Sequence, residues 1–179
     1  MKRILLPVVV AGLSVLGATA HATDDTINFN GSVIGTTCTI TVGGTVAPTA
    51  ATITLAPARD SDLNASGKTA VPTPFDIVLT NCTATGKVFA RFESVIVYSP
   101  SILPNTGTAT NVALQLYDNA VANGNVNAII VVGGAQNSST RVQVVAGAAT
   151  LKYGVQYYAS GVATVGTVKG QAVYSIVYE

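Results

Sequence analysis

The sequence predicts an all-β protein, a sandwich of short strands. The chain is rich in Val, Thr, Ala and Gly and contains no Trp, a composition typical of β proteins. Many short stretches alternate apolar and polar residues, and turn residues separate them at the spacing found in β-sandwiches. Helix should therefore be scarce.

The first half of the sandwich is expected to contain four strands. Residues 38–42 and 52–55 form the first two. A surface loop is expected at 56–74, because three prolines and one glycine interrupt it. Residues 75–82 form a well-marked strand that ends at the second cysteine, and 87–98 alternates between two sets of side chains before a proline-bracketed turn.

Five further strands are expected in the second half. Four are short, at 112–117, 128–132, 141–145 and 151–158. Residues 161–169 form a loop or bend, and 170–178 is the closing strand. No internal repeat or shift in composition marks a second domain, so residues 38–179 are expected to form one.

Residues 1–22 have the features of a signal peptide. Lys2 and Arg3 give a charged start, residues 4–16 are apolar, and small residues up to Ala22 offer a cleavage site. The apolar run is shorter than the roughly 20 residues that a membrane span needs. We therefore expect an exported chain of 157 residues, made of a short N-terminal arm at 23–37 and the domain.

Charge and cysteine content limit the partners and the compartment. Removing Lys2 and Arg3 changes the formal net charge from +1 to −1, and no basic cluster remains, so nucleic acid and anionic membranes are not expected as partners. Cys38 and Cys82 are the only cysteines. In an oxidising compartment they are expected to form a disulfide, which would stabilise the fold by roughly 4 kcal/mol on the chain-entropy model.

The sequence offers no catalytic, metal or cofactor site. The only histidine, His21, lies in the signal segment, so neither a histidine-activated nucleophile nor an imidazole metal site can be built. Asp60, Asp62 and Asn64 resemble the start of a calcium loop, but the glycine and the final glutamate of such a loop are missing. No enzymatic activity and no small-molecule substrate are therefore expected.

Both ends of the exported chain alternate in a way that suggests strands in need of a partner. In each of these two segments, every second residue lies on one face of the expected strand. These residues are Ile27, Phe29, Gly31 and Val33 in the arm, and Ala172, Tyr174, Ile176 and Tyr178 in the tail. Such an arrangement suggests strand exchange between molecules.

These features resemble the pilin family of the chaperone–usher pathway, whose members are subunits of type 1 and related fimbriae. The matching pieces are residues 27–34, the cysteine pair with 75–82, residues 113–118 and the tail 166–179. The tail has the penultimate tyrosine, the glycine fourteenth from the end and the alternating apolar residues of that family, here as Tyr178, Gly166, and Tyr174 with Ile176.

The resemblance implies an incomplete immunoglobulin-like β-sandwich that lacks its last strand and is completed by a donor strand from another subunit. Ile27, Phe29, Gly31 and Val33 would be the donor residues. The groove edge, which is also the expected chaperone contact, would be formed by five tail residues: Gly166, Ala172, Tyr174, Ile176 and Tyr178. The implied partners are neighbouring pilus subunits in a head-to-tail homopolymer, a periplasmic chaperone and an outer-membrane usher, and the implied location is a fimbrium on the cell surface.

The length favours a shaft subunit, since a tip adhesin would carry a second, receptor-binding domain. One alternative from another class stays open. The chain could be a secreted monomeric sandwich that binds a carbohydrate or a host protein through Tyr153, Tyr157 and Tyr158. The alternation of Leu151, Tyr153 and Val155 more often marks a strand facing the core.

Overall fold

The structure is a computed structural model that describes residues 38–47, 49–93, 101–120, 128–134, 136 and 140–179. All described residues lie within one compact unit of the chain, Ile34–Glu179. The expected signal peptide, the arm at 23–37 and its donor residues Ile27, Phe29, Gly31 and Val33 lie outside the described residues. Among the described residues, no helix has the length and apolar character needed to cross a bilayer.

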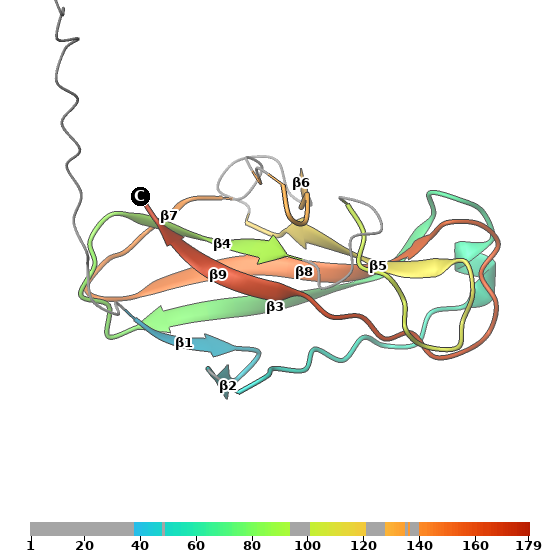
Figure 1. Ribbon diagram of the computed structural model, residues 1–179, viewed down its shortest axis with the longest axis horizontal. Helices are drawn as coiled ribbons and strands as arrows, with labels where there is room; N and C mark the ends of the chain where they lie inside the picture. The colour runs from blue at the N-terminus through green and yellow to red at the C-terminus, as the bar shows by residue number, and fades with distance from the viewer. Residues whose placement is uncertain (1–37, 48, 94–100, 121–127, 135, 137–139) are drawn as a thin grey trace, which may run out of the picture. The chain divides into compact units, whose positions relative to one another are not determined.

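The described residues form two antiparallel sheets, which confirms the all-β prediction (Figure 1). The larger sheet has the order β2-β1-β3-β8-β5-β6. Its strands are β1 (Thr39–Val42), β2 (Thr45–Val46), β3 (Thr69–Thr80), β5 (Val112–Asp118), β6 (Ala128–Ile129) and β8 (Ala149–Ala159).

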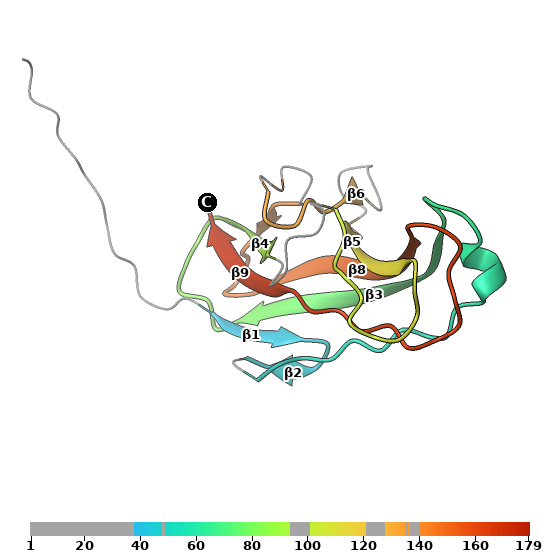
Figure 2. The same ribbon diagram turned by 45° about the vertical axis from the view of Figure 1, so that its right-hand side comes forward.

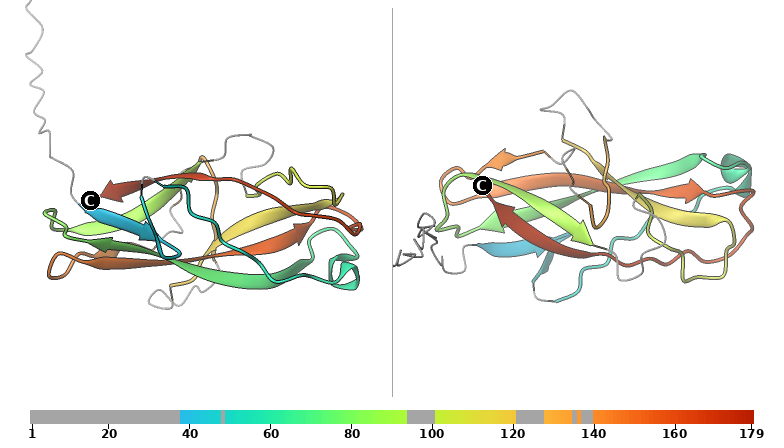
Figure 3. Two further views of the ribbon diagram at one scale, coloured as in Figure 1. Left: turned by 90° about the horizontal axis from the view of Figure 1, so that it is seen from below. Right: turned by 45° about the horizontal axis from the view of Figure 1, so that its top comes forward.

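The smaller sheet has the order β7-β4-β9 and packs over the larger one as a second layer (Figure 3). Its strands are β7 (Val142–Gln143), β4 (Lys87–Glu93) and β9 (Val173–Tyr178). The only helical element described is a single 3₁₀ turn, η1 (Asp60–Leu63).

The core lies between the two sheets. Alternating residues of the long strands supply it, including Ile77 and Leu79 of β3 and Leu151 of β8, which are almost completely buried. Period-two alternation places these side chains on one face of the large sheet. A disulfide between Cys38 and Cys82 connects the residue before β1 to the chain after β3, as predicted.

The boundaries of β3 differ from the prediction. Residues 69–74 were expected in a loop, but β3 begins at Thr69 and includes Pro72 and Pro74. The pairing of β1 with β3 ends at Ile77, so this part of β3 has no β1 neighbour, and a bulge shifts its register with β8 between Ala70 and Thr73. Prolines are tolerated in strands at bulges and edges.

The second predicted strand is not a sheet strand in the structure. Residues 52–55 are extended, and the side chains of Ala51, Ile53 and Leu55 pack partly buried against the core. The prediction of a strand at 52–55 is therefore wrong, because no described strand pairs with this extended segment. The hairpin of β1 and β2 was missed, although Gly43 and Gly44, both with positive φ, form the two-residue turn that such hairpins prefer.

The remaining strands follow the prediction with shifted ends. The strands β6 and β7 have two residues each, β8 is longer than expected, and β9 begins at Val173 rather than at Gly170. β4 is described as far as Glu93, and residues 94–98 of the predicted strand lie outside the described residues.

Candidate functional site: a groove beside β9

The strand β9 lies at the edge of the smaller sheet. All six of its residues pair with β4, from Val88 opposite Tyr178 to Glu93 opposite Val173. Within the described residues, no strand pairs with the other side of β9. The tail of the chain is therefore an edge strand, whose outward backbone groups can pair with a further strand.

The hydrogen-bond pattern shows which residues of β9 face outward. Glu179 and Lys87 exchange both backbone hydrogen bonds, at 2.8 and 3.0 Å. In an antiparallel ladder such pairs alternate with pairs that exchange none. Val173, Ser175 and Val177 should therefore bond to β4, whereas the N–H and C=O groups of Tyr174, Ile176 and Tyr178 point away from it.

An open groove of about 590 Å³ runs beside this edge. One wall is formed by residues 170–176, and the opposite wall by Ile40 and Val42 of β1 together with the segment 49–55. Figure 2 shows β9 on one side and β1 with the chain after β2 on the other. The groove is thus bounded on both sides by extended chain, which is the shape that a strand would fill.

The floor of the groove is apolar and belongs to the core. It is made of six side chains from both sheets and from the bridge at Leu103: Phe75, Phe92, Leu103, Leu114, Leu116 and Val155. Apart from partly buried Phe75, all of them are buried. The polar groups that a catalytic site needs are absent from this floor, and the described residues contain no cluster of His, Cys, Asp or Glu that could hold a metal ion.

The opposite edge of the small sheet is closed. The backbone N–H and C=O groups of Val88, Ala90 and Phe92 point away from β9. Of these three residues, only Val88 pairs with β7, opposite Val142. The Tyr153 hydroxyl accepts a hydrogen bond from Ala90 N at 2.9 Å. Gln136 takes the place of a strand at Phe92, because its Oε1 accepts from Phe92 N at 2.8 Å and its Nε2 donates to Phe92 O.

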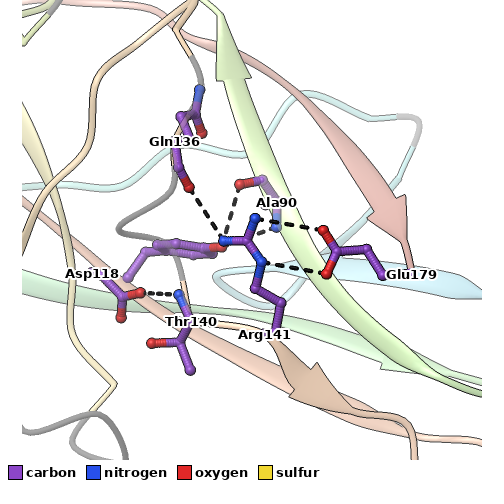
Figure 4. Close-up of polar contacts among 7 residues, drawn as sticks. Ala90, Asp118, Gln136, Thr140, Arg141 and Glu179 are labelled. Atoms are coloured by element: carbon purple, nitrogen blue, oxygen red, sulfur yellow. Dashed lines mark hydrogen bonds and ion pairs between the residues drawn. The ribbon is translucent and has the colours of Figure 1, made fainter.

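The end of β9 is fixed by its last residue. The Glu179 carboxylate lies 3.4 Å from Nε of Arg141 (Figure 4). The guanidinium of Arg141 stacks 4.0 Å from the centroid of the Phe89 ring. Partial exposure makes the ion pair weak, but together with the backbone bonds to Lys87 it fixes the register of β9 on β4. Burial raises the pKa of Tyr174, whose ring lies at the groove.

The structure brings most of the expected tail residues to this groove. Ala172, Tyr174 and Ile176 line it, and Tyr178 packs partly buried against the same core one step farther along β9. Gly166 lies elsewhere, at a hollow beside Ala109, where a Cβ would overlap the Ala109 backbone. The close approach of two loops explains that glycine.

Sequence reasoning missed the other wall and the closed edge. The alternation at 51–55 was a usable signal for the wall, whereas nothing in the sequence pairs Gln136 with Phe92, 44 residues away. Of the tyrosines considered for a monomeric binding site, Tyr153 is buried and the Tyr157 hydroxyl donates to Ala56 O at 3.2 Å. They do not form one exposed aromatic surface.

Comparisons with known proteins agree with this geometry. A family model described as fimbrial protein matches residues 27–179. The chain is 38% identical to the major fimbrial subunit SMF-1 of Stenotrophomonas maltophilia (strain K279a), over 89% of this chain and 95% of that protein. It is 35% identical to the F17 fimbrial protein of Escherichia coli, over 88% and 89% of the two chains.

Solved structures share the fold. The P pilus rod subunit PapA matches with a TM-score of 0.60 and 18% identity, over 80% of this chain and all of that one. A type I fimbria protein of Burkholderia pseudomallei matches with a TM-score of 0.54 and 29% identity, over 74% and 85%. These matches confirm the predicted fold class, the incomplete immunoglobulin-like sandwich. The chain belongs to the fimbrial protein family of chaperone–usher pilus subunits.

Proposed function

We propose that this protein is a structural subunit of a surface fimbria that polymerises non-covalently, head to tail, by strand complementation and so contributes to cell adhesion. The observation that carries the proposal is the apolar groove between the unpaired edge of β9 and the segment 49–55. Strand addition at a sheet edge gives affinity through main-chain hydrogen bonds and specificity through alternate side chains.

The side chains that a donor strand would cover belong to the walls of the groove, since the floor other than Phe75 is already buried within the subunit. Five apolar wall side chains are only partly buried: Ile40, Ile53, Leu55, Tyr174 and Ile176. Full burial of such a side chain is worth roughly 1.5 to 3 kcal/mol, so completing the burial of five of them is a sizeable share of the roughly 5 to 15 kcal/mol that stabilises a typical domain. A single subunit should therefore depend on another chain to cover the groove.

The donor in the polymer is the N-terminal arm of the next subunit, residues 23–37, freed when the signal peptide 1–22 is removed. Its alternate residues Ile27, Phe29 and Val33 would enter the groove, and Gly31 would lie where the groove is too shallow for a side chain. The pilin domain is then residues 38–179. Each copy gives one strand and receives one, a contact that does not close on itself and so forms a filament.

Before assembly, a periplasmic chaperone would cover the groove with a strand of its own, contacting Ala172, Tyr174, Ile176 and Tyr178. An outer-membrane usher would then exchange this strand for the arm of the next subunit. The route leads from the periplasm to a fimbrium on the cell surface. Membership of the family supports these partners.

The proposal is tested with two oxidised variants. One lacks residues 23–35, and the other carries that segment after Glu179 through a short Gly/Ser linker. The proposal expects a stable monomer from the second variant, and a first variant that aggregates or melts far below it. If both melt at the same temperature, the sandwich is already complete, and a monomeric binding module becomes the better account.

A further inference from the structure

Exposed valines lie at one end of the sandwich, in the loop between β8 and β9. The side chains of Val162 and Val165 are 64% and 87% exposed. Beside Val165, a hollow of about 150 Å³ is lined by Pro57, Ala58 and Tyr157, among others. Val162, Val165 and this hollow are called the far-end patch.

Another exposed valine lies at the opposite end of the sandwich. Val145 is 66% exposed and belongs to the turn between β7 and β8. The same end contains the disulfide, since Cys82 N donates to Gly147 O at 2.9 Å. Figure 1 shows this turn and the start of β1 at one end, and η1 with the loop before β9 at the other. The end with Val145 and Cys38 is called the near end.

The direction of the donor strand decides which ends meet in a polymer, and this step rests on the proposed function. Every strand pair described is antiparallel, and antiparallel pairing is slightly the more stable. A donor antiparallel to β9 begins beside Glu179 and ends beside Val173. It therefore leaves the groove toward the far end of the receiving copy.

The tether between the donor strand and its own domain is short. Only residues 34–37 separate Val33 from Cys38, and four residues span at most about 14 Å. The near end of the donating copy must consequently come to rest close to the far end of the receiving copy. This places an exposed valine on each side of the same junction.

We propose that the far-end patch of one copy binds the near end of the next copy, including the turn with Val145. The contact would bury the exposed valines of both copies and lies outside the groove, so it adds a second attachment to the one made by the donor strand in the groove, here called the strand joint. It would hold consecutive subunits at a fixed angle, which the strand alone, followed by a four-residue tether, does not define.

The test compares fibres assembled from the exported chain with those of Val165→Asp and Val145→Asp. Both variants should still assemble through the strand joint, but their fibres should dissociate in guanidinium roughly tenfold faster, as expected when partial burial of a valine is lost. The matched control is Val46→Asp on β2, where the valine is 53% exposed, and its fibres should dissociate like the unchanged ones.

If fibres of either Val165→Asp or Val145→Asp dissociate at the unchanged rate, this inference is wrong, but the proposed strand joint is not affected. Failure of the proposed function gives a different result, since Gly31→Asp chains would then form the same fibres as the unchanged protein.

A second experiment applies if the aspartate variants do not assemble. Fibres with Val145→Cys and Val165→Cys together are then treated with a short bismaleimide. A ladder of cross-linked subunits supports the contact. The control pair, Val46→Cys with Val165→Cys, should give no ladder, and the lack of a ladder for Val145→Cys with Val165→Cys refutes the contact.

Discussion

At both edges of the small sheet, backbone N–H and C=O groups point out of the sheet, but the surroundings of these groups differ between the two edges. On one side of β4, the outward backbone groups of Ala90 and Phe92 are bonded by side chains of the same chain, Tyr153 and Gln136. On the other side of the sheet, the outward groups of β9 face a groove with an apolar floor. An edge that is completed internally is not available to a further strand, whereas the edge at β9 is, as the proposed function requires.

The two edges also differ in how their partners are supplied. Tyr153 and Gln136, which bond the closed edge, are both buried. Buried backbone groups need hydrogen-bond partners, and at this edge the same chain supplies them, whereas the proposed function has a second chain supply them at the edge of β9.

The largest expected effect comes from a charge in the groove. Ile176→Asp places a carboxylate where a donor strand would bury it, at a cost of about 3–5 kcal/mol. Fibre assembly should stop, and the monomer with the relocated arm should lose stability in guanidinium unfolding. The control is Val46→Asp on β2, where the side chain is 53% exposed and does not line the groove. Equal behaviour of the two variants would show that the groove does not receive a strand.

A smaller effect is expected at the closed edge. Gln136→Ala leaves the buried N–H of Phe92 without this acceptor, which should cost about 1–3 kcal/mol and lower Tm by about 2–12 °C. The measurement is thermal unfolding of the monomer with the relocated arm. Gln143→Ala removes an exposed amide that donates to Gly86 O, and it should change stability by less than about 0.5 kcal/mol. Similar losses of stability for Gln136→Ala and Gln143→Ala would mean that the burial of a hydrogen bond does not set the cost of removing it.

Removing the Tyr153 hydroxyl should have the third-largest effect on stability. Tyr153→Phe keeps the ring that packs edge-on against Phe92 and removes the hydroxyl that accepts from Ala90 N and donates to Ala90 O, at a cost of about 1 kcal/mol. Amide hydrogen exchange at Ala90 should accelerate. Tyr157→Phe is the control, because its exposed hydrogen bond to Ala56 O should contribute less. A Tyr153→Phe protein with unchanged exchange at Ala90 would contradict the closed-edge interpretation.

The smallest effect concerns alkaline pH. Burial raises the pKa of Tyr174 in the folded protein, whereas in the unfolded chain the phenol ionises near its ordinary value of about 10. Above that pH the unfolded chain releases its proton first, so stability is full below about pH 10 and falls as the pH rises toward the folded pKa.

Tyr174→Phe should reduce this alkaline loss without abolishing it, because burial also raises the pKa of Tyr117 and Tyr157. The free energy of unfolding at pH 8 and at two values above 10 measures the change. An alkaline slope equal to that of the unchanged protein would show that Tyr174 does not contribute.

Much of the site could be predicted because its signals are local. The alternation of Ala172, Tyr174 and Ile176 marked the strand that lines the groove, and the cysteine pair predicted the disulfide. Alternation also appeared at 51–55, but whether an extended segment has a neighbouring strand depends on chain far away in sequence. The same limit applied to β3, where proline suggested a loop and the bulge that accommodates Pro72 was not visible.

The all-β class, the disulfide and the strand at the edge of the groove follow from period-two alternation and cysteine content, which act over a few residues or through composition. Which edge is closed and which is open depends on packing between distant parts of the chain. Gln136 and Phe92 meet across 44 residues, and Tyr153 and Ala90 across 63. Contacts of that kind arise from the packing of two sheets, and no local pattern specifies them.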